Sequence, residues 1–247
     1  SVGQVHLARL ADGVDVVVKV QHAGIESKVR SDLNLLGAVA QLAETNSKEL
    51  AHYHPTATVA EFSRSLRREL NFHTELTNLL RFAQNFAGDP KVHIPVAYPE
   101  LSSRRVLTME KLNGYSVANA AQMAADGVDR KALAGLFANC MMQMIFRDGF
   151  YHADPHPGNL FVLPGQRLGL LDCGKVGRVD EQTRDDFIGI VASFLTGDVE
   201  SLTEQLVELC ETPIDLNRAA YKADVAEFVG EFRESVDGNL DLGAAFE

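Results

Sequence analysis

The feature that most constrains the fold is a polar loop that precedes two short apolar segments in the second half of the chain. The loop runs from residue 154 to 159, and the apolar segments span residues 160–162 and 168–171. Short apolar runs bounded by turn residues are typical of buried strands. We therefore expect two short strands here, with Asp154, Asn159 and Asp172 in the loops that flank them.

The spacing of these three residues is that of a phosphoryl-transfer site. Kinases place a loop Asp on the acceptor hydroxyl, an Asn five residues later on a metal ion, and a second Asp at a strand end on the metals that bridge the phosphates. Amide and carboxylate oxygens suit Mg²⁺. Asp154 and Asn159 could instead be ordinary turn residues. That alternative is disfavoured because His152, the apolar strand after Asn159 and the sequence Asp172-x-Gly174 all occur together.

A lysine near the start of the chain extends this pattern. Kinases use a strand lysine that reaches the α and β phosphates, and a helix Glu that pairs with it. Lys19 lies in the β-branched run 14–20, although an exposed lysine on an edge strand would look the same in isolation. Glu69 and Glu75 both fall in a segment of helical periodicity and compete as its partner.

Periodicity predicts an α+β, two-lobed, protein-kinase-like architecture. The runs 5–9 and 14–20 surround a turn signal and indicate a hairpin. Apolar residues at helical spacing then indicate two long helices, the second spanning about residues 59–82. A second β region ends at the hinge signal Asn113-Gly114. We predict an N-terminal lobe, 1–113, with a small antiparallel sheet and long helices, and a larger, mostly helical C-terminal lobe, 114–247.

Composition excludes several kinds of protein. The net charge of −11 disfavours nucleic acid as a partner, because that partner needs a clustered basic surface. No apolar run approaches the roughly 20 residues of a membrane-spanning helix. Cys140, Cys173 and Cys210 are widely separated, so neither a disulfide framework nor a zinc site is indicated. The chain opens at Ser1 as if at the end of a loop, and we expect a fragment of a longer protein.

Six separated segments resemble the UbiB (AarF-domain) family of atypical kinases, over nearly the whole chain. They are Ser1-Val2-Gly3-Gln4-Val5-His6, Val18-Lys19-Val20-Gln21, residues 69–78, residues 108–114, residues 152–159 and Asp172-Cys173-Gly174. The first resembles the end of the family's alanine-rich nucleotide loop, which implies nucleotide contacts for Val2 and Gln4. The fourth resembles the hinge, which implies that the backbone of Glu110 and Leu112 binds adenine. The resemblance also selects Glu75 as the partner of Lys19.

Three departures from the family pattern stand out. The family's Glu-x-Asp motif reads Glu69-Leu70-Asn71, which loses a carboxylate. The middle residue of Asp-Phe-Gly is Cys173, which removes an aromatic ring but keeps the metal-binding Asp172. The family's Lys-x-Gly-Gln helix and alanine stretch would lie upstream of Ser1.

The resemblance implies an ATP- and Mg²⁺-binding atypical kinase or ATPase that supports ubiquinone or other isoprenoid-lipid metabolism. Asp154, Lys19 and Glu75 would then be catalytic, and Asn159 and Asp172 would hold the metal. Prenyl lipids or quinone-pathway proteins are the implied partners. We expect a cytoplasmic location or peripheral membrane contact on the cytoplasmic side.

Two alternatives remain open on the residues. A small-molecule kinase of the aminoglycoside or choline type carries a similar His-x-Asp-x-His-x-x-Asn loop, but the segments at residues 4–6 and 69–78 favour the UbiB resemblance. A non-enzymatic scaffold could instead use ATP binding to shift a conformational equilibrium. A protein substrate is less expected, because Ala153 replaces the Arg of His-Arg-Asp and no Ala-Pro-Glu segment occurs.

Overall fold

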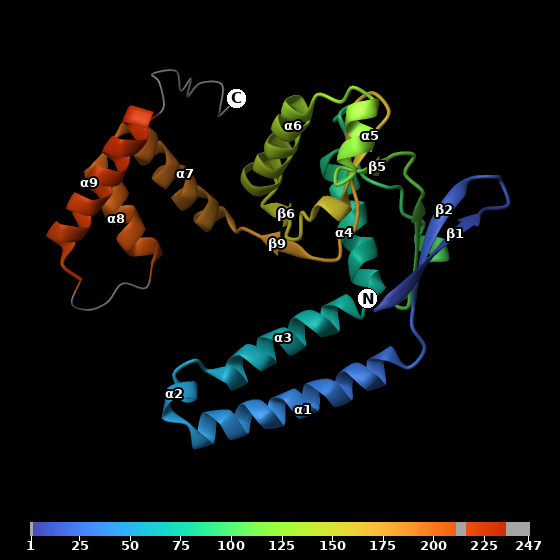
Figure 1. Cartoon of the computed structure of the whole chain (residues 1–247), viewed down its shortest axis with the longest axis horizontal. Helices are drawn as coiled ribbons and strands as arrows, with labels where there is room; N and C mark the ends of the chain where they lie inside the picture. The colour runs from blue at the N-terminus through green and yellow to red at the C-terminus, as the bar shows by residue number, and fades with distance from the viewer. Residues whose placement is uncertain (1, 211–215, 236–247) are drawn as a thin grey trace. The chain divides into compact units, whose positions relative to one another are not determined.

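The computed structural model describes residues 2–210 and 216–235, and the chain divides into two compact units, 1–177 and 178–247 (Figure 1). Small sheets combined with a majority of helices confirm the α+β class. Within the described residues, no helix has the length and apolar character needed to span a bilayer. The predicted boundary between residues 113 and 114 stays a prediction, because one compact unit can contain two kinase-like lobes.

The first unit begins with a three-stranded antiparallel sheet of β1 (Gly3–Arg9), β2 (Asp15–Gln21) and β4 (Val106–Glu110), in the order β1-β2-β4. The predicted hairpin is β1–β2. Its turn is closed by Asp12, whose carboxylate accepts from Val14 N, and by Gly13 at φ +90°. Lys19 lies opposite Val5 on one side and Leu107 on the other, in the central strand.

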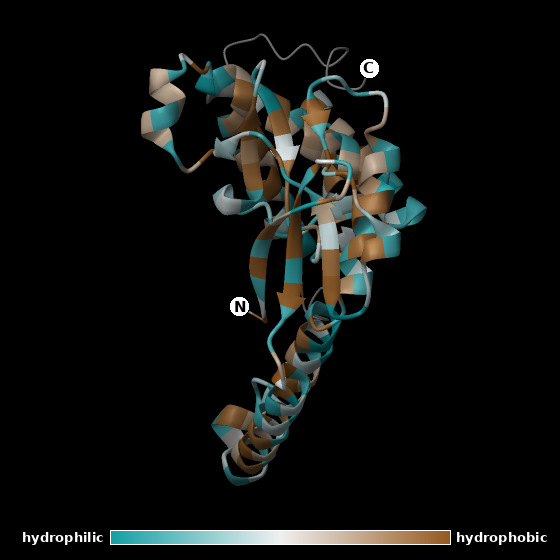
Figure 2. Cartoon of the chain, turned by 90° about the vertical axis from the view of Figure 1, so that its right-hand side faces the viewer, coloured by the Kyte–Doolittle hydropathy of each residue, from teal (hydrophilic) through white to brown (hydrophobic). Residues whose placement is uncertain are grey.

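Four helices follow β2: α1 (Ile25–Asn46), α2 (Lys48–Ala51), α3 (Pro55–Glu69) and α4 (Phe72–Asn85). Helices α1 and α3 run side by side in both views (Figures 1 and 2). The prediction of one continuous helix over residues 59–82 was wrong. The chain breaks after α3 because Asn71 adopts an extended conformation and its side chain accepts from His73 N, which makes it the N-cap of α4.

A second sheet has the order β3-β8-β7-β5, built from β3 (Val92–His93), β5 (Tyr115–Ser116), β7 (Leu160–Leu163) and β8 (Arg167–Leu170). Strands β7 and β8 are the two predicted from the sequence. Gly114 precedes β5, and a Cβ there would lie 2.3 Å from Val162 O, so only glycine fits. Short strands β6 (Phe150–His152) and β9 (Val176–Arg178) pair with each other.

The remaining helical elements of the first unit lie between these strands. They are α5 (Ala120–Ala125), α6 (Arg130–Met142), the π-helical segment Gln143–Arg147, and the 3-10 turns Pro99–Leu101 and Pro157–Asn159. Leu133 and Cys140 are the buried residues of α6, and Met144 is buried in the π-helical turn after it.

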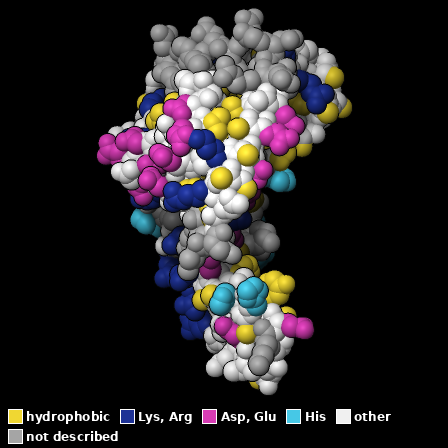
Figure 3. All heavy atoms as spheres, turned by 90° about the vertical axis from the view of Figure 1, so that its left-hand side faces the viewer, with side chains coloured by type: hydrophobic (Ala, Val, Ile, Leu, Met, Phe, Trp, Pro, Cys, Tyr) yellow, Lys and Arg dark blue, Asp and Glu magenta, His cyan; other side chains and the backbone are white. Residues whose placement is uncertain are grey.

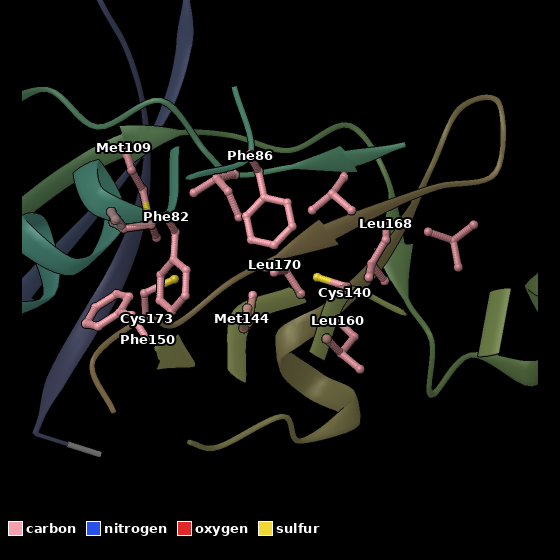
Figure 4. Packing of buried hydrophobic residues seen from close by; sticks show 14 of the residues in the cluster. Phe82, Phe86, Met109, Cys140, Met144, Phe150, Leu160, Leu168, Leu170 and Cys173 are labelled. Atoms are coloured by element: carbon pink, nitrogen blue, oxygen red, sulfur yellow. The ribbon is translucent and has the colours of Figure 1, made fainter. Parts of the chain in front are cut away.

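The core of the first unit packs α4, α6 and the second sheet against one another (Figure 4). Phe82 of α4 and Phe150 of β6 are fully buried, with ring centroids 4.7 Å apart. Cys173 is fully buried in the same cluster. Because Cys173 is anchored in this core, the adjacent Asp172 and Gly174 are held at its edge.

The second unit consists of α7 (Glu181–Thr196), α8 (Val199–Leu209) and α9 (Arg218–Ser235). Asp180 and Asp198 cap α7 and α8 through their side chains. Leu202, Val225 and Val229 form a small core between α8 and α9. Cys210 follows α8 and is exposed. Acidic, basic and hydrophobic side chains are interspersed on the face that Figure 3 shows.

Candidate functional site

The deepest part of the site is an ion pair between the first sheet and α4. Lys19 Nζ lies 2.6 Å from Glu75 Oε1 and 3.6 Å from Asp172 Oδ1. The side chains of Lys19 and Glu75 are 15% and 6% exposed, whereas that of Asp172 is 54% exposed. Glu75 rather than Glu69 is therefore the partner of Lys19, and one lysine joins the sheet, the helix and the segment after β8.

Burial and charge attraction oppose each other in this pair. Burial disfavours the Lys19 ammonium, but the carboxylates of Glu75 and Asp172 outweigh that effect, so the pKa of Lys19 lies above its ordinary value. Burial raises the pKa of Glu75, because Lys19 offsets the lost hydration only in part. Lys19 thus keeps the positive charge that a phosphate ligand requires.

Helix α4 positions both Glu75 and the segment after β8. Glu75 lies in the first turns of α4, which begins at the Asn71 cap. One turn later, the buried Asn78 donates from Nδ2 to Cys173 O at 2.8 Å. Asn71, which stands where the Glu-x-Asp motif of the family has its second carboxylate, is the N-cap of α4.

The loop after β6 is organised by a buried histidine. His152 Nδ1 accepts from Asp154 N at 3.1 Å, and its Nε2 donates to Leu171 O at 3.0 Å. Asn159 Nδ2 donates to Asp154 O at 3.1 Å, and Leu171 N donates to Asn159 O at 2.8 Å. These bonds tie the Asp154 loop to the end of β8, one residue before Asp172.

Asp172 has an unusual backbone conformation. Its φ is +52°, in the left-handed region that costs a non-glycine residue energy, although Asp and Asn tolerate it better than most. A side chain at Gly174 would place its Cβ 3.3 Å from Asp172 Oδ1. The Asp172 side chain is 54% exposed, whereas the neighbouring Cys173 is fully buried, so the Asp172 carboxylate lies at the edge of the core.

A cavity of about 430 Å³ opens beside these side chains. Its lining includes six of the residues that the sequence singles out: Val2, Gln4, Lys19, Glu75, Asp154 and Asp172. Three others, Asn159, Glu110 and Leu112, are not in its lining. The structure thus brings together most of the residues expected around the phosphates. The expected metal ligand Asn159 and the two residues expected around adenine lie outside the lining of this cavity.

At the expected hinge, Glu110 already forms hydrogen bonds within the protein. Glu110 N donates to Val96 O at 2.7 Å, and Glu110 Oε2 accepts from Val96 N at 3.0 Å and lies 2.9 Å from His93 Nε2. The side chain of Leu112 is buried. Adenine contacts by the backbone of Glu110 and Leu112 stay a prediction.

The donor set fits magnesium. The Nδ2 atom of Asn159 is used by Asp154 O, which leaves the amide Oδ1 as the acceptor of that side chain. Asp172 supplies carboxylate oxygens, and the residue before it, Leu171, donates from its backbone N to Asn159 O at 2.8 Å. In the described part of the chain, no three His, Cys, Asp or Glu side chains group closely enough to hold a metal by themselves. Two hard oxygen donors completed by substrate phosphates are typical of Mg²⁺ sites.

Two residues of the site were missed by the sequence reasoning. Lys175 lines the cavity, and its Nζ is 3.2 Å from both Asp154 Oδ2 and Glu69 Oε1. Glu69 was considered only as a rival partner for Lys19. A basic residue directly after the Asp172-x-Gly174 turn was the available signal, but no general pattern assigns a role to it.

Comparison with known proteins identifies the family. Residues 1–206 match the family described as the ABC1 atypical kinase-like domain. The "Probable protein kinase UbiB" of Azotobacter vinelandii is 32% identical over 229 residues, 91% of this chain and 43% of that protein. The protein of the same name from Glaesserella parasuis is 32% identical over 244 residues, 95% of this chain and 43% of the relative. The chain thus spans less than half the length of these relatives.

A solved structure supports the fold. The complex of Rv3197 with erythromycin from Mycobacterium tuberculosis gives a TM-score of 0.71 at 22% identity, and the match covers 94% of this chain and 59% of that one. The kinase-like fold and the resemblance to UbiB proteins are both confirmed. The chain belongs to the ABC1 atypical kinase-like family.

Proposed function

We propose that this kinase-like chain binds Mg-ATP and transfers or hydrolyses its terminal phosphoryl group, in support of ubiquinone or other isoprenoid-lipid metabolism. The observation that carries the proposal is the convergence of Lys19, Glu75, Asp154 and Asp172 on one cavity. Phosphoryl transfer needs little covalent help from a protein, so positioning and charge stabilisation at such a cavity can supply most of the catalysis.

Each residue has a distinct task in this proposal. Lys19, held by Glu75, binds the α and β phosphates. Asn159 and Asp172 hold Mg²⁺, which neutralises the charge that develops on the phosphates. Asp154 orients the acceptor hydroxyl or water and receives its proton.

The nucleotide's remaining contacts come from two other segments. Val2 and Gln4, at the start of β1, line the cavity and cover the phosphates. The backbone of Glu110 and Leu112 would bind adenine. Their separation from the cavity in the structure means that adenine would lie beyond its present boundary.

The lipid part of the proposal comes from the relatives. They are named for UbiB, and the chain resembles them over more than nine-tenths of its length. Prenyl lipids or proteins of quinone biosynthesis are the proposed partners, with peripheral membrane contact as the mode of access. The phosphoryl acceptor would then be a small molecule or water rather than a protein.

ATP turnover by the purified protein with Mg²⁺ tests the proposal, with and without vesicles that contain a prenyl lipid. Asp172→Asn is the informative variant, because Asn also tolerates a positive φ and so spares the backbone. Asp32→Asn, on the exposed face of α1, is the matched control. We expect lipid-stimulated turnover in the wild type and in Asp32→Asn, and its loss in Asp172→Asn.

The other outcomes separate the alternatives. Magnesium-dependent ATP binding without turnover would favour a nucleotide-gated scaffold. Phosphorylation of an aminoglycoside or choline would favour a small-molecule kinase. Failure of the wild-type protein to bind ATP at all would contradict the proposed site.

A further inference from the structure

Lys175 is a second lysine in the cavity, and it comes from a different segment than Lys19. It follows the 172–174 turn and precedes β9. Its Nζ is 3.2 Å from Asp154 Oδ2 and 3.2 Å from Glu69 Oε1. These side chains are between 30% and 51% exposed, so the ammonium lies at the rim of the cavity, in contact with solvent.

Stability alone does not account for this arrangement. Exposed ion pairs contribute about 0–1 kcal/mol, because water and salt screen them and the side chains lose freedom. The Asp154 and Glu69 carboxylates hold the Lys175 ammonium and keep its pKa above its ordinary value. The result is a lysine that stays charged and localised beside the residue proposed to face the acceptor.

The cavity needs such a charge. Four acidic side chains line it, and a bound nucleotide adds the negative charge of its phosphates. The acidic residues are Glu69, Glu75, Asp154 and Asp172, and the basic ones are Lys19, Arg68 and Lys175. Lys19 is already engaged by Glu75 and Asp172.

The Asp154 loop does not supply a cation of its own. Its sequence from 154 to 159 contains neither Lys nor Arg. His156 Nδ1 accepts a hydrogen bond from Gly158 N within the same loop. Lys175 is the cation that touches Asp154.

We infer that Lys175 is a catalytic residue that binds the terminal phosphate of the nucleotide, an inference that rests on the proposed function. Glu69 and Asp154 hold its ammonium before the nucleotide arrives. Placed charges of this kind stabilise the negative charge that spreads over the transferred group.

The chemical step balances without consuming Lys175. The bond between the terminal phosphorus and the bridging oxygen breaks, and its electron pair stays with ADP. The acceptor oxygen forms the new bond to phosphorus, and its proton passes to Asp154. With water as the acceptor the products are ADP and phosphate, and Asp154 returns the proton to solvent. Lys175 contributes charge and hydrogen bonds only.

The test compares two nucleotides that differ by the terminal phosphate. The affinities of Mg-ADP and of a non-hydrolysable Mg-ATP analogue are measured by calorimetry for the wild type, Lys175→Met and Lys175→Arg. Lys131→Met, an exposed lysine at the start of α6, is the control. Thermal unfolding of each variant checks that it folds.

We expect Lys175→Met to bind the ATP analogue about tenfold more weakly, a loss of about 1.4 kcal/mol, because the variant lacks the charged hydrogen-bond donor to the terminal phosphate. Its affinity for ADP should stay within about twofold, and Lys175→Arg should recover most of the loss. Equal losses for both nucleotides, or none for either, would overturn the role of Lys175 and leave the proposed function intact. A wild-type protein that binds neither nucleotide would overturn both.

Discussion

Lys19 and Lys175 line the same cavity and each contacts two carboxylates, yet they lie in opposite environments. Lys19 is almost wholly enclosed by the sheet and α4, at 2.6 Å from Glu75. Lys175 is half exposed at the rim, at 3.2 Å from each partner. Removing one partner of an enclosed ion pair leaves an uncompensated charge without water, whereas a rim charge regains its hydration. The comparison therefore separates a pair on which the fold depends from one that can change partners when a ligand enters.

The largest expected effect is on turnover. Lys19→Met should lower kcat for Mg-dependent ATP turnover by about 10²-fold or more, because a preorganised charge on the phosphates is lost. Steady-state kinetics of the purified protein measure this, with Lys131→Met as the control. Turnover within about threefold of the wild type would contradict the central role of the enclosed lysine.

The next effect is on stability, and it contrasts Glu75 with Glu69. Glu75→Ala should lower the free energy of unfolding by about 3 kcal/mol, because the enclosed Lys19 ammonium loses its nearest carboxylate. Glu69→Ala should cost less than about 1 kcal/mol, since Lys175 remains hydrated. Urea unfolding of both variants measures the difference. Equal losses would show that the two lysines do not differ as described.

The dependence of stability on pH sharpens the same contrast. The pKa of Lys19 is raised above its ordinary 10.5, so its pairing stabilises the fold below that pH and the contribution is lost as pH rises through the folded-state pKa. The gap in unfolding free energy between wild type and Lys19→Met should therefore stay constant up to about pH 9.5 and shrink as the pH rises above about 10.5. A difference in unfolding free energy that stays constant or widens above about pH 10.5 would contradict a raised pKa of Lys19.

The smallest effect is expected at the rim. Lys175→Met should change the unfolding free energy by less than about 0.5 kcal/mol. The carboxylates of Asp154 and Glu69 raise the pKa of Lys175, but solvent screens these ion pairs, so their loss costs little. Thermal unfolding in low and high salt measures this. A loss as large as that of Glu75→Ala would make Lys175 a structural residue.

Local patterns in the sequence predicted much of this fold. The β-branched run at Lys19, the turn at Gly13 and the apolar segments around residues 160–171 each formed the strand or turn expected, because each signal depends on neighbouring residues only. The prediction of a continuous helix over 59–82 was wrong. The spacing of the apolar residues stays helical across residues 70–71, whereas the Asn71 side chain caps α4 and ends the helical backbone there.

The site was predictable to the extent that a family pattern covers it. Residue spacing alone left Glu69 and Glu75 as equal rivals, since a helical Glu is usually a surface residue. The role of Lys175 depends on its contacts with Glu69 and Asp154, which are distant in sequence and meet only in the folded chain. Such contacts leave no periodicity in the sequence, which is why the rim of the cavity escaped prediction.

The different burial of the three cysteines makes the protein ready for site-specific labelling. A thiol reacts as its thiolate, and burial raises the pKa of Cys140 to about 12 and that of Cys173 further still. Cys210 is exposed. A maleimide dye should therefore attach at Cys210 in the native protein without any mutation. It would give the second unit a fluorescent reporter while the cavity beside Lys19 in the first unit remains unmodified.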